Sequence, residues 1–276
     1  MSIIIDGYNP RLENIFKGGH TVRDISTPYV TVSRSLIGST GGNEWRGLTN
    51  CYMFFYKSKL DCAKGGLDLP DGLGPSSRFY VRGSSVFEGN DKYNGILSGG
   101  RSSFSGVIVS GFLRGIFAHK GHTGLGFVAA HDCMDGVVGN ITSSGNLYCN
   151  GNTGAGLWAY QHNMEIGNYI PNKSNTNAPY TFLKGNGVGL LSDEGSHVTT
   201  ARIHSQANRV GLMAVYRGSI TFGKGGNPSY INGNQLDIEA YDGGFIRGYL
   251  SGGAVGNCSP QSGTVGNSQS YILITQ

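Results

Sequence analysis

The stretch GLMAVYRGSITFGKGG, Gly211–Gly226, begins with a phrase that the chain repeats: a glycine, an aliphatic residue and a large apolar residue. Reading back from Gly211, the phrase returns at steps of 22, 33, 20 and 21 residues. A period of roughly 20 residues predicts a solenoid of short strands, because repeats built from two helices usually need more than about 30 residues. The earlier copies are Gly189-Leu190-Leu191, Gly156-Leu157-Trp158, Gly136-Val137-Val138 and Gly115-Ile116-Phe117.

The composition agrees with many short strands and tight turns. Glycine supplies 47 of 276 residues, about 17% against a usual level of roughly 7%, and it provides the positive φ angles that repeated turns need. Segments such as Val107–Val109 and Ser219–Phe222 are β-branched or aromatic and lie between turn-forming residues. The 15 Tyr and 12 Phe residues are too many for a disordered chain. Long apolar stripes of helical period are missing, so we expect little helix.

Asparagines set the register of the repeat. Asn186, Asn208 and Asn234 each stand three residues before the aligned positions Gly189, Gly211 and Asp237. An asparagine at the same corner of successive turns either hydrogen-bonds along the stack as a ladder or merely favours the turn, and both interpretations keep the register. Three short strands and three turns fill one period. We therefore predict an all-β, right-handed parallel β-helix with three sheets.

The predicted organisation has three parts: an N-terminal cap (1–50), a parallel β-helix (51–250) and a C-terminal closing segment (251–276). The alignment predicts at least five consecutive parallel rungs between Ser105 and Tyr249. The residues expected to stack inside the solenoid are Ile116, Val137, Leu157, Leu190 and Leu212.

The 33-residue step contains an insertion of loop-like composition, Asn168–Tyr180. Insertions in a repeat project from one face, which is often the binding face. Aromatic rings near this bulge could form platforms for sugar rings, although Trp158 also occupies a position where other rungs place packed apolar residues. The candidate glycan-binding residues are Trp158, Tyr160, His162, Tyr169 and Tyr180.

Acidic residues raise the possibility of catalysis. Glycoside hydrolysis needs two carboxylates about 5 to 5.5 Å or about 6.5 to 9.5 Å apart, and adjacent rungs lie about 4.7 to 4.9 Å apart. The rung after Asp193 and Glu194 offers Val215 and Tyr216 at the matching positions, so no adjacent pair emerges and the sequence favours binding over catalysis. The candidate catalytic residues are Asp193, Glu194, Asp237 and Glu239.

Several other functions find no support in the sequence. His119, His122 and His131 cluster in sequence but have no ordered carboxylate partner, so we expect neither a metal nor another cofactor. The net charge of +4 comes without a basic run, which disfavours nucleic-acid binding. There is no signal-like segment and no apolar run of about 18 residues, so we expect no membrane insertion. The five cysteines are an odd number without metal-like spacing, which is typical of folding in a reducing cytoplasm.

The rungs NGVGLLSDEGSHV (186–198) and NRVGLMAVYRGSI (208–220) resemble the β-helical bodies of bacteriophage tailspikes and tail fibres, which are similar in fold to pectate lyases. The resemblance covers roughly residues 100–250 and is one of pattern, without a diagnostic motif. It implies a homotrimer in the virion tail, assembled in the bacterial host cytoplasm, with other tail proteins and a host cell-surface glycan as partners.

The function that these observations predict is attachment of a virion to host surface polysaccharide during adsorption. Two alternatives stay open. The first is a polysaccharide depolymerase, either hydrolase or lyase, that uses the acidic residues. The second is a structural spacer or decoration protein of the virion. Detection of new reducing ends or unsaturated products after incubation with a polysaccharide separates the depolymerase from an attachment protein.

Overall fold

The computed structural model describes residues 2–6, 29–33, 36–39, 52–56, 59–62, 67–69, 78–82, 85–88, 94–98, 102–104, 107–167, 179–223, 228–261 and 270–275. Every regular element within these ranges is a β-strand. The chain divides into two compact units, unit 1 (Met1–Met134) and unit 2 (Asp135–Gln276). None of the described residues forms a helix with the length and hydrophobicity to cross a membrane.

Unit 1 is built from parallel strand pairs. Strand β2 pairs with β1 and β4, β7 pairs with β4 and β10, and β8 pairs with β5 and β11, always in parallel. The strands are β1 (Ser2–Asp6), β2 (Tyr29–Ser33), β3 (Leu36–Ser39), β4 (Tyr52–Tyr56), β5 (Lys59–Cys62), β6 (Leu67–Leu69), β7 (Arg78–Arg82), β8 (Ser85–Glu88), β9 (Asn94–Ser98), β10 (Ser102–Phe104), β11 (Val107–Ser110), β12 (Arg114–Leu125) and β13 (Val128–His131).

Unit 2 has the same kind of parallel strand pairing. They are β14 (Asp135–Ser143), β15 (Leu147–Asn150), β16 (Ala155–Tyr160), β17 (Asn163–Ile166), β18 (Thr181–Lys184), β19 (Val188–Asp193), β20 (His197–Thr200), β21 (Ile203–Gln206), β22 (Val210–Ala214), β23 (Ser219–Phe222), β24 (Tyr230–Ile231), β25 (Leu236–Ala240), β26 (Phe245–Tyr249), β27 (Ala254–Val255), β28 (Cys258–Ser259) and β29 (Tyr271–Thr275).

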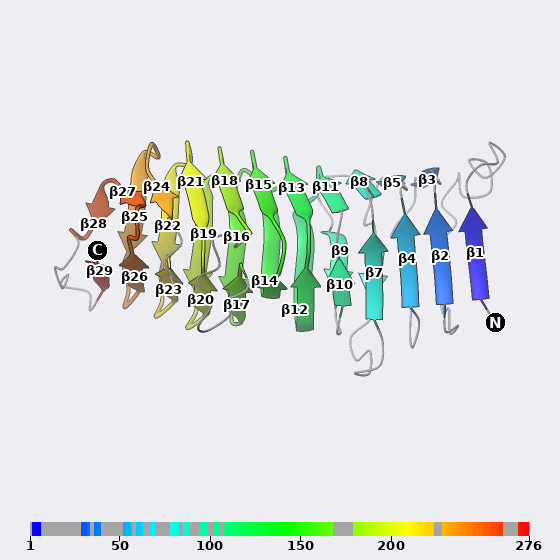
Figure 1. Ribbon diagram of the computed structural model, residues 1–276, viewed down its shortest axis with the longest axis horizontal. Coiled ribbons are helices and arrows are strands. Elements are labelled where there is room, and N and C mark those ends of the chain that lie inside the picture. The colour runs from blue at the N-terminus through cyan, green and yellow to red at the C-terminus, as the bar shows by residue number, and fades with distance from the viewer. Residues whose placement is uncertain are drawn as a thin grey trace. The chain divides into compact units, whose positions relative to one another are not determined.

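The strands of unit 2 form three faces. On the first face β16, β19, β22, β25 and β28 pair in parallel, and Figure 1 shows the first four side by side. The second face joins β17, β20, β23, β26 and β29. The third face joins β15, β18, β21, β24 and β27. The chain visits each face once per turn, so unit 2 is a parallel β-solenoid, and the all-β parallel β-helix prediction is confirmed.

The core of unit 2 is a set of aliphatic columns. Each member sits directly above its partner in the next rung, and almost all are shielded from solvent. This confirms the inward positions predicted for Val137, Leu157, Leu190 and Leu212, while Ile116 is buried in unit 1. The first-face column is Val137, Leu157, Leu190, Leu212 and Ile238. The second-face column is Met164, Val198, Ile220, Ile246 and Ile272.

The repeated glycine has a steric cause. A Cβ built on Gly136 would lie 2.5 Å from the carbonyl oxygen of Gly156, and one on Gly156 would lie 2.8 Å from that of Gly189. Gly189 and Gly211 approach the next rung at least as closely. Such contacts involve backbone atoms, which cannot swing aside. Any side chain at this corner would push two rungs apart, which explains why the phrase begins with glycine each time.

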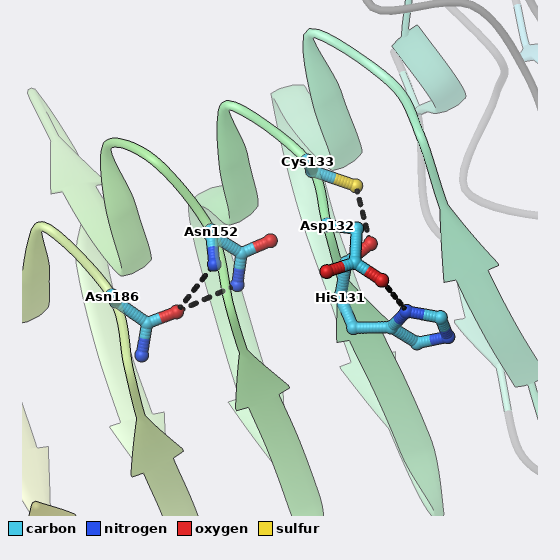
Figure 2. A network of polar contacts seen from close by, with 5 residues as sticks. All are labelled: His131, Asp132, Cys133, Asn152 and Asn186. Carbon is cyan, nitrogen blue, oxygen red and sulfur yellow. Dashed lines mark hydrogen bonds and ion pairs between the residues drawn. The ribbon is translucent and has the colours of Figure 1, made fainter. Parts of the chain in front are cut away.

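The asparagine ladder beside the glycines is confirmed. The backbone N–H and the Nδ2 of Asn186 both donate to Oδ1 of Asn208, at 2.8 and 2.9 Å. Asn208 donates in the same way to Asn234, at 2.9 and 2.8 Å. Asn152 is a further member, and Figure 2 shows its two nitrogens reaching Oδ1 of Asn186 at 3.0 and 2.9 Å. The ladder ends at Asp237, whose Oδ1 accepts from both nitrogens of Asn234.

The domain boundaries stay a prediction. The range 1–50, expected to form a cap, contains β1, β2 and β3, and these strands pair in parallel with one another or with later strands. The division between compact units falls after Met134, inside the range predicted as one β-helix.

Candidate functional site

The third face of unit 2 carries a column of rings on its outer side. Tyr148, Phe182, His204 and Tyr230 are register partners on β15, β18, β21 and β24. All four are half-buried, whereas the residues that flank them in each strand are buried in the core. We call this set the aromatic column. It arises because the second residue of each of the first three strands, and the first residue of β24, points away from the core.

The rings of the column contact one another but do not form a uniform stack. Tyr148 and Phe182 are nearly parallel, with centroids 5.0 Å apart and planes 8° apart. At His204 the planes turn by 49° relative to Phe182 and by 57° relative to Tyr230, with centroid distances of 5.3 and 4.8 Å. The first two rings are therefore stacked, whereas His204 is tilted relative to both of its neighbours in the column.

Tyr180 and Arg202 flank the column. The Tyr180 ring lies 5.3 Å from Phe182 and 5.1 Å from His204, edge-on to the latter. The guanidinium carbon of Arg202 sits 3.4 Å from the Tyr180 ring centroid, a cation–π contact. Tyr180 is also tied to the preceding rung, because its backbone N–H donates to Oδ1 of Asn146 at 2.8 Å. These contacts fix an extended apolar surface with a positive charge at its border.

A surface pocket of about 220 Å³ lies along the column. Its polar side is a second register column made of Asn150, Lys184 and Gln206, which are the last residues of their strands. Gln206 donates to Oδ1 of Asn232 at 3.4 Å, which continues this polar column. The pocket is lined by Tyr148, Asn150, Phe182, Leu183, Lys184, His204 and Gln206.

The electrostatics of the pocket follow from partial burial. Burial lowers the pKa of His204, and the positive charge of Arg202 lowers it further, so the imidazole is neutral at pH 7. Burial also lowers the pKa of Arg202, which stays charged. Within the described part of the chain, neither Nε2 of His204 nor Oδ1 of Asn150 has a hydrogen-bond partner, although both are shielded from water. Such buried polar atoms are energetically costly to leave unpaired.

The predicted glycan-binding residues are divided between two faces. Trp158 and Tyr160 lie on the first face, with ring centroids 5.4 Å apart. Trp158 packs, together with Leu191, against an apolar cluster of Ala155, Val188, Val210, Met213 and Val215. This placement supports the interpretation in which the indole packs against protein.

The other predicted members have different surroundings. His162 lies at a turn, where its backbone N–H donates to Oγ of Ser196 at 3.2 Å. Tyr180 is beside the aromatic column on the third face. Tyr169 lies outside the described residues, as does most of the insertion. The structure therefore brings one of the predicted residues, Tyr180, to the pocket region. The role of the five predicted residues in glycan binding stays a prediction.

Two of the candidate catalytic carboxylates follow each other at one turn. The backbone N–H of Glu194 donates to Oδ1 of Asp193 at 2.7 Å, and Nε2 of Gln161 donates to the Glu194 carboxylate at 2.6 Å. Burial raises the pKa of Asp193, the Glu194 N–H lowers it, and the Glu194 charge raises it. Tyr241 lies near by, and its pKa is raised first by burial and then by the charge of Glu239.

Asp237 has a different environment. It is only 4% exposed. Its Oδ1 accepts from Asn234 and its Oδ2 accepts from the backbone N–H of Asn257 at 3.0 Å. These contacts give Asp237 a structural role at the end of the ladder. A catalytic role for Asp193, Glu194 and Glu239 stays a prediction.

The turn His131–Cys133 of unit 1 combines three residue types that can do chemistry, and Figure 2 draws it. Nδ1 of His131 pairs with Oδ2 of Asp132 at 2.7 Å, in an exposed position. The buried Cys133 thiol donates to the backbone oxygen of His131 at 3.4 Å, so it does not face the imidazole. Among the described residues no group of three or more His, Cys, Asp or Glu side chains could hold a metal ion.

The four residues of the aromatic column were not predicted as a site from the sequence. Its signal is present in the third strand of each rung, LYCN (147–150), TFLK (181–184) and IHSQ (203–206), where the second residue is always a ring. The insertion before Tyr180 hides this alignment, because it separates the first two strands by 34 positions instead of 22.

Comparison with known proteins adds no identification: no family model, no curated protein and no solved structure matches this chain.

Proposed function

We propose that this protein binds polysaccharide along the third face of unit 2. The observation that carries the proposal is the half-buried aromatic column with a polar column beside it and a pocket between the two. Sugars present apolar C–H patches together with hydroxyl groups, and a site of rings bordered by amides and cations complements both. The four rings are only half-buried, so part of their surface is open to a ligand.

The site spans several rungs, which suits a polymer better than a single small sugar. The pocket takes residues from β15, β18 and β21, and adjacent parallel strands lie about 4.8 Å apart. A ligand laid across these strands would contact about 10 Å of surface, the length of about two sugar units. Repeated rungs offer equivalent contacts to repeated sugars, so a chain can bind through several weak contacts.

Replacement of Phe182 by Ala tests the proposal. It removes the central ring of the column, and we expect affinity for the recognised polysaccharide to fall about tenfold or more, equivalent to about 1.4 kcal/mol. The matched control is Phe245→Ala on the second face, where Phe245 stacks on Tyr271 at 5.7 Å with planes 3° apart. Binding is measured by calorimetry after a glycan-array screen, and melting temperature reports folding. Equal affinities for Phe182→Ala, Phe245→Ala and the parent would contradict the proposal.

The biological setting that we propose is adsorption of a virion to its bacterial host, as the resemblance to tailspikes and tail fibres implies. The protein would then be a homotrimer attached to other tail proteins. Trimer formation is tested by light scattering, which should give three times the chain mass of 29.2 kDa. A monomer at micromolar concentration would contradict this part of the proposal and leave the binding face untouched.

A depolymerase is the second candidate, and one observation favours it: carboxylates gather near Tyr241, where the charges of Glu239, Asp242 and Asp193 all act on its pKa. The raised pKa of Asp193 suits a general acid. Asp193 lies on the first face and the pocket on the third, so a chain held in the pocket is not presented to this carboxylate. Product release by the parent that Asp193→Asn abolishes would establish cleavage.

A further inference from the structure

The charges on the third face point to a particular class of polysaccharide. Lys184 lines the pocket and is exposed, and Arg202 borders the column through its contact with Tyr180. Strands β15, β18, β21, β24 and β27 contain no Asp or Glu. In the described strands of unit 2, the carboxylates lie on other strands: Asp135, Asp193, Asp237 and Glu239 on β14, β19 and β25, and Glu165 on β17. The third face is therefore cationic.

The polar groups of the pocket include donors from which a carboxylate can accept hydrogen bonds. Lys184 supplies an ammonium group without acceptor capacity, and Asn150 and Gln206 supply side-chain amides. A carboxylate on a sugar ring accepts hydrogen bonds from two donors and is attracted by the ammonium charge.

We propose that the pocket selects an acidic polysaccharide whose sugars carry carboxylate groups, and that Lys184 is the residue that determines this preference. The inference rests on the proposed function and adds the chemical class of the ligand to it. The aromatic column supplies affinity for the sugar rings regardless of charge, whereas Lys184 distinguishes an acidic chain from a neutral one. Charge selectivity and overall affinity therefore depend on different side chains.

The experiment compares carboxylated polysaccharides with the same polymers after carboxyl reduction. The probes are alginate, hyaluronan and polysialic acid, their carboxyl-reduced forms, and dextran sulfate as a sulfated polymer. Binding is measured at low and at high salt for the parent, Lys184→Gln and Phe182→Ala. The control is Arg247→Gln, which removes one exposed positive charge from the second face. It leaves the third face unchanged.

We expect the parent to bind at least one carboxylated polymer about tenfold more tightly than its reduced form, with affinity that falls as salt rises. Lys184→Gln should lose about fivefold of the affinity for the acidic form and little for the reduced form. Arg247→Gln should remain within about twofold of the parent for both. Phe182→Ala should weaken binding of both forms.

The outcomes separate the two proposals. Equal binding of acidic and reduced polymers, or binding of neutral polymers alone, overturns the acidic preference and leaves polysaccharide binding standing. Dextran sulfate bound more tightly than every carboxylated polymer overturns the assignment to carboxylates. A preference for acidic forms that Lys184→Gln leaves intact overturns the role of Lys184. Failure to bind any polysaccharide in the panel or on the array overturns both proposals.

Discussion

Replacement of Asn208 by Ala tests the physical account of the solenoid most directly. The Asn208 side chain is 2% exposed and occupies the centre of the ladder. Its Oδ1 accepts from the backbone N–H and the Nδ2 of Asn186, while its Nδ2 lies within hydrogen-bond distance of Leu183 O, Ser205 Oγ and Asn234 Oδ1. Alanine provides none of these contacts.

The expected cost follows from the groups left behind. Two accepted bonds are lost at Oδ1, and the two hydrogens of Nδ2 serve three acceptors, so about four net hydrogen bonds disappear. At about 1 kcal/mol each, the free energy of unfolding should fall by about 4 kcal/mol. The buried N–H of Asn186 is left unpaired, while the Nδ2 of Asn186 keeps its bond to Cys149 O. Because this donor is buried and has no partner, small movements of the surrounding structure should not restore the lost stability.

Two measurements check this prediction. Denaturant unfolding gives the change in stability, and hydrogen exchange reports the Asn186 amide, which should exchange much faster in the variant. The control is Asn163→Ala, an exposed strand position where the same substitution should change stability by at most about 0.5 kcal/mol. A cost for Asn208→Ala below about 1 kcal/mol, with Asn186 still protected, would refute the assignment of the ladder as a main source of stability.

Three further predictions concern packing and pH. Leu212→Ala should cost about 2 to 5 kcal/mol in denaturant unfolding because Leu212 is 0% exposed, whereas Leu191→Ala, on the outer side of the first face, should cost about 1 kcal/mol; similar costs would contradict the register. Gly211→Ala should cost about 1 to 3 kcal/mol and lower the melting temperature, because its Cβ would meet a carbonyl of the next rung. Burial and then Arg202 lower the pKa of His204 in the folded protein. The unfolded chain therefore takes up a proton first as pH falls below about 6.5. This contribution of His204 to stability is present above that pH and is lost as the pH falls toward the folded pKa. The melting temperature of the parent should therefore drop more between pH 7.5 and 5.5 than that of His204→Gln. An equal drop in the two proteins would contradict a lowered pKa of His204.

The sequence by itself determined the rung register of unit 2. Asn186, Asn208 and Asn234 predicted the register at which the structure shows a ladder, and the glycine motif predicted Leu190 above Leu212. The reason is that several successive rungs meet the same steric and hydrogen-bonding demand at this corner: a glycine where the next backbone comes within contact distance, and an amide that bonds to its copy. Where the same contact recurs from rung to rung, the same residue types recur periodically in the sequence.

Only the tertiary structure decided which side chains form a site. Tyr148 and Phe182 stand 34 positions apart, and an insertion hides their alignment, yet the solenoid stacks their rings 5.0 Å apart. Trp158 and Tyr180 are closer in sequence but lie on different faces, because the chain runs along β17 of the second face between them. Which face a residue occupies depends on the summed lengths of all preceding strands and turns. A local pattern therefore predicts the rung, while the assembled fold selects the neighbours that make a binding surface.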